Sequence, residues 1–114
     1  MDSCIFCKIV RGELPATVVY KDKQVTAFRD IRPVAPIHIL VVPNKHITST
    51  NDVVSQDEQL LGHMLTVVKL IAEEQGVAQS GYRLIINTGP DAHQAVLHLH
   101  LHIIGGQRMR HPMG

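Results

Sequence analysis

The chain is organised around the sequence AVLHLHLHIIGG, which covers positions 95–106 and repeats histidine at every second residue. His98, His100 and His102 alternate with leucine and isoleucine, a pattern typical of a β-strand with one polar and one apolar face. On such a strand the three imidazoles point the same way, while the apolar face anchors them to a core. Imidazole is a nucleophile, a proton carrier or a metal ligand near neutral pH, so this face is a candidate functional site. The simpler alternative is a half-exposed strand whose solvent face happens to be histidine.

Length and composition restrict the remaining possibilities. The chain has 114 residues, 45% of them hydrophobic, which suits one domain over residues 1–114 with its own core. The formal net charge is +1, so electrostatics favours neither nucleic acid nor a membrane surface as a partner. No apolar run reaches the roughly 18 residues of a membrane span, and the N-terminal stretch lacks the apolar core of a signal peptide. We therefore expect a cytoplasmic protein.

Apolar periodicity predicts two helices and five strands. The helices cover residues 3–10 and 55–75, and the strands cover 17–20, 24–29, 38–42, 82–87 and 97–104. The first two strands form a predicted hairpin. This order of elements indicates an α+β fold with a mostly antiparallel five-stranded sheet, one short helix and one long helix.

Three local signals set the expected helix ends. Ser3 is a candidate N-cap of the short helix, Ser55 and Glu58 match a capping box for the long helix, and Gly76 marks its end. The long helix has an apolar face and no evident chemistry of its own. His63 within it is expected at the surface.

Several polar residues lie near the ends of the predicted strands. Asp30, taken alone, is best explained as a turn residue that accepts hydrogen bonds from its own backbone. His38, taken alone, is best explained as a polar side chain whose hydrogen bonds are met by nearby groups, and not as a catalyst. Asn87 and Gln94 flank the loop before the histidines, and Gly89 in that loop lets the backbone approach a ligand closely.

Cys4 and Cys7 lie three residues apart, on one side of the predicted short helix. Three explanations remain open. A redox pair usually follows a strand, which is absent here. The others are two buried structural thiols, or half of a zinc site that takes two further ligands from elsewhere in the chain.

The histidine row itself admits two kinds of chemistry. Successive same-face residues on a strand are about 6.6 Å apart, so three ligands would span roughly 13 Å and converge poorly on one metal ion. Covalent catalysis fits the spacing better, because His100 has a histidine on each side to hold its tautomer, stabilise charge or protonate a leaving group. Such a division of labour suits attack on a phosphate, where charge spreads over several oxygens.

The histidine row and several other segments of the chain resemble a known family. The sequence HLHLHII at 98–104 is similar to the signature of the histidine triad (HIT) superfamily. Further segments resemble its nucleotide-binding branch, in the bacterial form, and together they cover nearly the whole chain: CIFCKI at 4–9, AFRDI at 27–31, APIH at 35–38, VPNKHI at 42–47, LGH at 61–63, GYR at 81–83 and GG at 105–106.

The resemblance implies a fold and an activity. It implies a homodimer in which the sheet continues across the interface into ten strands. It also implies hydrolysis of adenosine 5'-phosphoramidates and aminoacyl adenylates to AMP, with no cofactor needed for the chemistry. By position, His100 is then the nucleophile that forms a nucleotidyl-histidine, His102 contacts the phosphate and assists the leaving group, and His98 and His38 support them.

The resemblance also implies a binding site for a purine nucleotide. Asp30 takes the ribose hydroxyls, which replaces its simple role as a turn residue. Asn87 and Gln94 lie beside the ribose and the phosphate, with Ala95 next to them. The residues that match the lining of the base pocket are Phe6, Phe28, Ile31 and Leu14.

Two departures from the family pattern alter what is expected of the site. The loop before the triad usually reads GGQS, but here it reads AHQA, so His93 replaces a glycine and Ala95 replaces a serine. Loss of the serine hydroxyl removes a donor near the scissile bond, which can reduce the rate by ~10²–10³-fold if nothing replaces it. The tail carries His111 where animal members have tryptophan, so their tail-dependent selectivity does not transfer.

Some bacterial relatives use the residues matching Cys4, Cys7, His46 and His98 to bind a structural zinc ion, and all four are present here. Two alternatives to the hydrolase remain open. One is a non-catalytic, regulatory protein that binds purine nucleotides in the same pocket. The other is a dinucleoside polyphosphate hydrolase, which belongs to a different branch of the superfamily.

Overall fold

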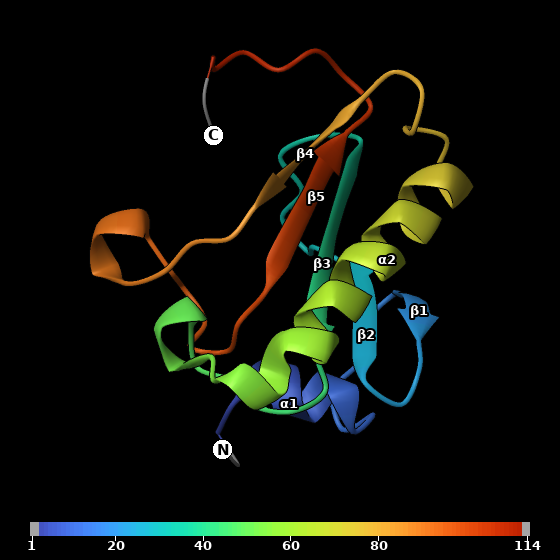
Figure 1. Cartoon of the computed structure of the whole chain (residues 1–114). Helices are drawn as coiled ribbons and strands as arrows, with labels where there is room; N and C mark the ends of the chain where they lie inside the picture. The colour runs from blue at the N-terminus through green and yellow to red at the C-terminus, as the bar shows by residue number, and fades with distance from the viewer. Residues whose placement is uncertain (1–2, 113–114) are drawn as a thin grey trace.

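Five antiparallel strands form one sheet in the order β1-β2-β3-β5-β4 in the computed structural model, which describes residues 3–112 (Figure 1). The extreme ends of the predicted domain 1–114 lie outside the described residues. Two α-helices and three short 3₁₀ helices complete the fold, so the α+β prediction is confirmed. No helix within residues 3–112 is both long and apolar enough to cross a bilayer. The strands are β1 (Val18–Lys21), β2 (Val25–Arg29), β3 (Ile37–Pro43), β4 (Tyr82–Ile85) and β5 (Leu101–Gly105); the helices are α1 (Ile5–Val10), α2 (Glu58–Glu74), η1 (Thr50–Asp52), η2 (Ser55–Asp57) and η3 (Pro90–Ala92).

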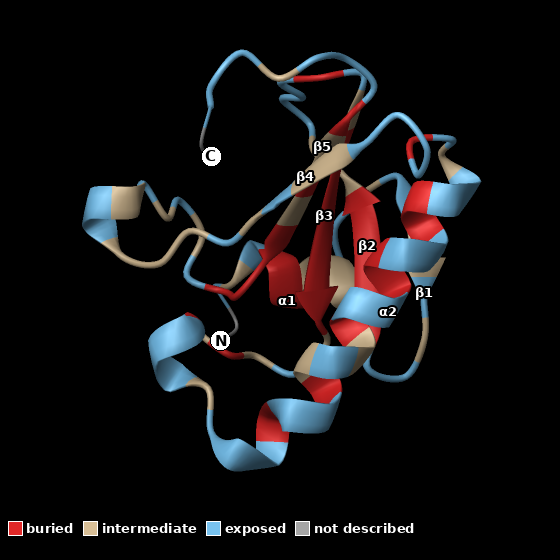
Figure 2. Ribbon diagram, turned by 45° about the horizontal axis from the view of Figure 1, so that its top comes forward, coloured by how far each residue is buried: buried red, intermediate tan, exposed pale blue. Residues whose placement is uncertain are grey.

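Side chains that alternate along the central strands divide between two cores. Figure 2 shows β2 and β3 coloured as buried along most of their length. Ile39 and Val41 of β3 belong to the larger core, which α2 covers with residues such as Met64. Leu40 and Val42 of the same strand belong to a smaller core on the other face, which α1 covers with Phe6. Because side chains alternate with a period of two, His38 lies on the α1 face with Leu40 and Val42.

The predicted histidine strand is shorter than expected. Strand β5 begins at Leu101, so His98 and His100 precede it and the three histidines do not form one row on a single strand. The prediction was wrong because His98 is fully buried beside the two thiols, and Leu99 donates its N–H to the Ile47 carbonyl at 2.6 Å. The apolar half of the pattern is confirmed where Leu99, Leu101 and Ile103 enter the larger core, whereas Leu97 is exposed.

The helix starts also differ from the sequence-based expectation. Cys4, not Ser3, is the N-cap of α1, and its Sγ accepts the Cys7 N–H. The capping box predicted at Ser55 and Glu58 does not form: Asp57 instead accepts the Val54 N–H at 3.0 Å, which adds the turn η2 before α2. The predicted stop is confirmed, because Gln75 is the C-cap of α2 and Gly76 follows with φ +76°.

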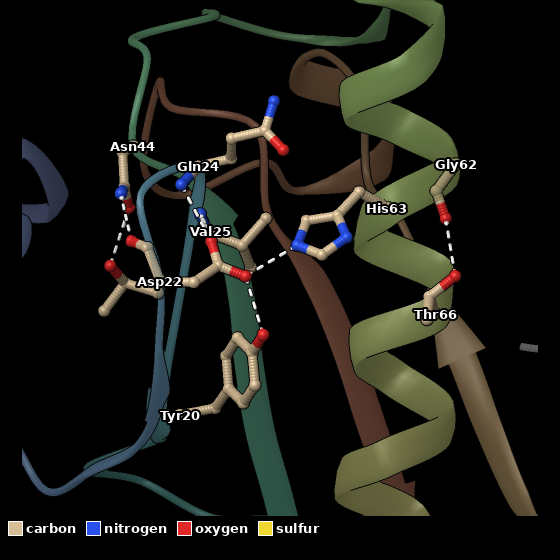
Figure 3. A network of polar contacts seen from close by, with 9 residues as sticks. Tyr20, Asp22, Gln24, Val25, Asn44, Gly62, His63 and Thr66 are labelled. Atoms are coloured by element: carbon tan, nitrogen blue, oxygen red, sulfur yellow. Dashed lines mark hydrogen bonds and ion pairs between the residues drawn. The ribbon is translucent and has the colours of Figure 1, made fainter.

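A polar network joins the β1–β2 hairpin to α2 (Figure 3). Asp22 Oδ2 accepts from the Tyr20 hydroxyl and lies 2.6 Å from His63 Nε2, while its Oδ1 accepts the N–H groups of Gln24 and Val25. His63 is therefore a half-buried partner of the hairpin and not the plain surface residue that was expected. Burial alone would raise the pKa of Asp22, but these four hydrogen bonds outweigh it and hold the pKa well below its usual range.

Candidate active site

His38 and His102 come from neighbouring strands and meet on the α1 face of the sheet. In the β3–β5 register, His38 lies opposite Ile104 and His102 lies opposite Leu40, so the two histidines are diagonal neighbours. Their rings are 5.2 Å apart between centroids, and His38 Nε2 lies 2.9 Å from His102 Nδ1. The sheet register therefore builds this pair from positions 64 residues apart in the sequence.

Backbone contacts decide where the protons of this pair reside. The Val34 N–H is donated to His38 Nδ1 at 3.1 Å, so that nitrogen carries a lone pair. Neutral His38 then holds its proton on Nε2 and donates it to His102 Nδ1. As a consequence, neutral His102 carries its own proton on Nε2, where it can be donated to a ligand.

Burial keeps both imidazoles neutral at physiological pH. The pKa of His102 is lowered to about 4, chiefly by burial and also by the neighbouring His100 and His38, while Asp30 opposes the shift. Burial likewise lowers the pKa of His38, against the opposing effect of the Asp30 carboxylate. Asp30 Oδ2 lies 3.5 Å from His38 Nε2, and its Oδ1 accepts the Arg32 N–H at 2.7 Å, as a turn residue would.

His100 lies beside this pair with its tautomer set by the backbone. Its Nδ1 is 2.7 Å from the His98 carbonyl oxygen, and because a carbonyl can only accept, Nδ1 must carry the proton. Nε2 therefore keeps a lone pair, which is the form of imidazole that attacks an electrophile. The ring packs edge-on against Phe6 at 5.1 Å and lies 5.1 Å from the His102 ring.

A second cluster forms on the far side of His98. The ligand atoms of Cys4, Cys7, His46 and His98 all lie within 4.8 Å of one another. His98 Nδ1 is 3.3 Å from Cys4 Sγ and 3.5 Å from Cys7 Sγ, and His46 Nδ1 is 3.3 Å from Cys7 Sγ. Cys4 is the N-cap of α1 and Cys7 lies within that helix, while His46 comes from the loop after β3 and His98 from the segment before β5. The fold brings them together as one donor set.

The chemistry of this cluster fits a tetrahedral zinc ion. Two sulfur and two imidazole donors are a common structural set, and His98 Nε2 donates to the Pro43 carbonyl at 2.9 Å, which leaves Nδ1 free to bind. Burial, the hydrogen bond from Cys4 and its charge raise the pKa of the Cys7 thiol in the metal-free protein. Zinc would favour the thiolate form and relieve that penalty.

An apolar cavity lies next to the histidines, between α1 and the sheet. Its volume is about 280 Å³, and its walls include Phe6, Phe28 and Leu40, with Asp30 and Ile31 at one side. Phe6 and Phe28 meet edge to face at 5.3 Å. A flat aromatic ring such as a nucleobase fits such a cavity, and the carboxylate of Asp30 can accept hydrogen bonds from sugar hydroxyls.

The structure places the other residues expected in the site less directly. Leu14 is exposed and does not line the cavity, where Pro15 and Ala16 take its place. Asn87 is half-buried two residues beyond β4. Ala95 is exposed and lines a different cavity, together with Cys4 and His46.

Gln94 holds the loop before the histidines in shape. Its Nε2 donates to the Thr48 and Val96 carbonyls, and its Oε1 accepts the Gly89 N–H. Within the loop, His93 has φ +58° and ψ +41°, a left-handed conformation that favours glycine. The residue that replaces the family's glycine therefore occupies a backbone position where glycine fits best.

Sequence reasoning missed the groups that set the proton positions. The Val34 N–H and the Pro43 and His98 carbonyls are backbone atoms, for which no residue pattern is diagnostic. It also did not foresee that Arg83 reaches the C-terminal tail, where it donates to the His111 carbonyl at 2.9 Å. The only available signal was the cluster of arginines in the tail.

Comparisons with known proteins agree with this geometry. The model of the HIT domain family matches residues 11–109. The chain is 52% identical to the purine nucleoside phosphoramidase of Escherichia coli strain K12, over 93% of this chain and 89% of that protein. A HIT family hydrolase from Legionella pneumophila superposes with a TM-score of 0.95 at 49% identity, covering 98% of this chain and 100% of the other. A histidine triad protein from Clostridium difficile superposes with a TM-score of 0.93 at 49% identity, covering 97% and 96%. With its family match, its fold and its three clustered histidines in agreement, this chain belongs to the HIT domain family.

Proposed function

We propose that this protein hydrolyses purine nucleoside 5'-phosphoramidates, and aminoacyl adenylates by the same route, to release AMP. The observation that carries the proposal is the tautomer of His100, whose Nδ1–H is bound by the His98 carbonyl so that Nε2 is available for attack. The apolar cavity beside it suits a purine, and the name of the Escherichia coli relative supports a phosphoramidate substrate.

The reaction follows as two displacements at phosphorus. His100 Nε2 attacks the α-phosphorus, the bond from phosphorus to nitrogen breaks, and the departing amine takes a proton from solvent. Water then attacks the nucleotidyl-histidine, loses a proton and releases AMP with neutral His100. The sum is one phosphoramidate and one water converted to AMP and one amine.

His102 and His38 act on the charge that develops during these steps. The Nε2–H of His102 is placed to donate to a phosphate oxygen or to the leaving atom, and His38 keeps it in that tautomer. A donor held in advance in a buried site stabilises developing charge without reorganisation, and one such donor is worth about 10²–10³-fold in rate.

The test is turnover of adenosine 5'-phosphoramidate by the wild type, His100→Asn and His100→Ala. Both variants should lose turnover by at least about 10³-fold while keeping the wild-type melting curve. His63→Asn is the matched control, because it removes a histidine on the other face of the sheet and should retain activity. Mass spectrometry of quenched wild-type protein should locate an adenylyl group on His100.

Near-normal turnover by His100→Asn would refute the proposal. The second candidate is a non-catalytic protein that binds purine nucleotides, which the missing hydroxyl at Ala95 favours. Calorimetric binding of AMP by the wild type, without product from any phosphoramidate or adenylate, would establish that function instead.

We also propose that the Cys4, Cys7, His46 and His98 cluster binds a structural zinc ion. The support is the donor set and the Pro43 carbonyl that orients His98. When bound, zinc would hold α1 against the segment that carries His100 and would take no part in the reaction.

A homodimer is the proposed assembly, with β4 at its interface. β4 is an edge strand, and edge strands present unpaired backbone groups that can continue a sheet. Leu84 on β4 is 40% exposed and is paired in register with Ile103, so it lies on the α2 face, where Leu65 and Leu70 are also exposed.

Sedimentation of the wild type and of Leu84→Lys tests the assembly. The wild type should sediment as a dimer and Leu84→Lys largely as a monomer. Val18→Lys is the control, since Val18 is 46% exposed on β1 at the opposite edge. A monomeric wild type at micromolar concentration would contradict the proposal.

A further inference from the structure

A second cavity lies between the sheet and the C-terminal tail, residues 106–112. Its volume is about 580 Å³. Its floor includes Ile85 and Ile104, and its walls include Arg83 of β4 and two arginines of the tail, Arg108 and Arg110. Figure 1 shows this tail leaving the end of β5 beside β4.

The register of the sheet places this cavity on the far side of His102 from the apolar cavity between α1 and the sheet. Across the strands, Phe28 pairs with Leu40, Leu40 with His102, and His102 with Ile85. Cross-strand partners share a face, so these side chains follow one another on the α1 face at the strand spacing of about 4.8 Å. Phe28 and Leu40 line the apolar cavity, and Ile85 lines the second one.

This order suggests what the second cavity receives. A nucleotide with its base over Phe28 and Leu40 has its phosphorus at His100 and His102. Phosphorus also carries a second group, on the side away from the nucleoside. That group then extends over Ile85. In the proposed reaction that group is the leaving group, which makes the second cavity its binding site.

The charge of the cavity indicates which leaving groups it accepts. Three of the six arginines of the chain line it, and none of the acidic residues that the structure describes does. Within residues 3–112, none of these three guanidinium groups forms an ion pair. Arg83 donates to the His111 carbonyl at 2.9 Å and so holds the tail above the floor.

Arginine is suited to binding carboxylates, because its planar guanidinium donates two parallel hydrogen bonds to the two oxygens. We propose that the second cavity selects leaving groups that carry a carboxylate, such as the amine of an acidic amino acid. This specificity rests on the proposed phosphoramidate hydrolysis. The carboxylate is remote from the bond that breaks and remains ionised throughout.

The experiment compares three substrates that differ in one group. They are adenosine 5'-phosphoramidates in which phosphorus is bound to the α-amino nitrogen of glutamate, glutamine or lysine. The α-carboxyl group of each amino acid is converted to an amide, so that the compounds differ only in the side chain. The wild type should hydrolyse the glutamate compound with a kcat/KM about tenfold above that of the glutamine compound, as expected for one charged hydrogen-bonded pair. The lysine compound should be the poorest, and added salt should reduce the preference.

Variants then locate the source of the preference. Arg108→Gln and Arg110→Gln should each lower the glutamate-to-glutamine ratio, and the double variant should bring it close to one. Lys69→Gln is the matched control: it removes one positive charge from α2, on the other face of the sheet, and should keep the wild-type ratio.

Two results would overturn the inference. One is a ratio near one in the wild type, and the other is a ratio that the double variant leaves unchanged. Faster turnover of a dinucleoside tetraphosphate than of the glutamate compound would show that the cavity serves a phosphate chain, and would also overturn the carboxylate assignment. Unsubstituted adenosine 5'-phosphoramidate tests the proposed function separately, because its leaving group does not reach the arginines.

Discussion

The ring of His100 donates its Nδ1–H to the backbone carbonyl of His98 at 2.7 Å, while the ring of His98 faces the thiols of Cys4 and Cys7. His98 therefore belongs to two sites. Its backbone carbonyl binds the nucleophile His100, and its imidazole belongs to the cysteine cluster. Any change that moves His98 is expected to alter both the stability of the α1 region and the orientation of His100.

Zinc should stabilise the wild-type protein, because a ligand that binds only the folded state raises its stability by mass action. At about a hundredfold excess over the dissociation constant, the melting temperature should rise by roughly 10 °C, and a chelator should reverse the rise. Cys7→Ser should abolish the response, whereas Ser3→Ala, outside the ligand set, should keep it. An equal response of Cys7→Ser and the wild type would exclude the cluster as the zinc site.

Replacing His38 should change the titration of His102. The pKa of His102 is lowered to about 4, chiefly by burial, and His38 contributes to the lowering. His38→Ala opens the site to water and removes that neighbour, so the pKa of His102 should rise toward the ordinary histidine value. NMR titration of the imidazole carbon-bound protons measures it.

The same variant should reduce kcat, because His102 loses the hydrogen bond that sets its tautomer. We expect a loss of about 10–100-fold, as for partners that orient a functional histidine. His63→Asn should leave the pKa of His102 unchanged. A His38→Ala variant with wild-type kcat would contradict the role of His38 in setting the tautomer of His102.

His93→Gly should stabilise the fold. The left-handed backbone of His93 costs a residue with a side chain roughly 1–2 kcal/mol, which glycine avoids. Glycine loses more backbone entropy on folding, so the expected net gain in unfolding free energy is about 0.5–1 kcal/mol. Chemical denaturation measures it, with Ala92→Gly as the control. Ala92 lies in η3, so this change should destabilise; a destabilised His93→Gly would refute the strain assignment.

The Asp22 network should make stability depend on pH in the acid range. The pKa of Asp22 is lower in the folded state than in the unfolded chain, whose value is about 3.9. Its contribution is therefore fully present above about pH 4 and is lost as the pH falls toward the folded-state value. Asp22→Asn should lower the unfolding free energy by about 1–2 kcal/mol at neutral pH.

Urea denaturation across the acid range compares this variant with Asp91→Asn. Asp91 is exposed in η3, so its replacement should leave the acid dependence of stability unchanged. Below pH ~4, the unfolding free energy of Asp22→Asn should depend less steeply on pH than that of the wild type or of Asp91→Asn. A slope equal to that of the wild type would show that another carboxyl governs the acid transition.

Much of the fold followed from periodicity. The order of helices and strands was predicted correctly, because the segments 24–29, 38–42 and 58–74 carry strong apolar patterns. The errors lie where a contact distant in sequence overrides a local pattern. His98 leaves the strand because it is buried beside Cys4 and Cys7, and Asp57 displaces the expected Ser55 and Glu58 capping box.

Through its spacing of histidines and apolar residues, the sequence by itself predicted the antiparallel α+β sheet and the histidine triad, whereas the residues of the cysteine cluster were implied only by the resemblance to the HIT superfamily. Only the tertiary structure decided the proton positions, which depend on the Val34 N–H and the His98 and Pro43 carbonyls. It also decided that Arg83, Arg108 and Arg110 share a cavity beside His102. The physical reason is that backbone hydrogen bonds and strand register depend on how distant segments pack, whereas apolar periodicity is a local property of each segment.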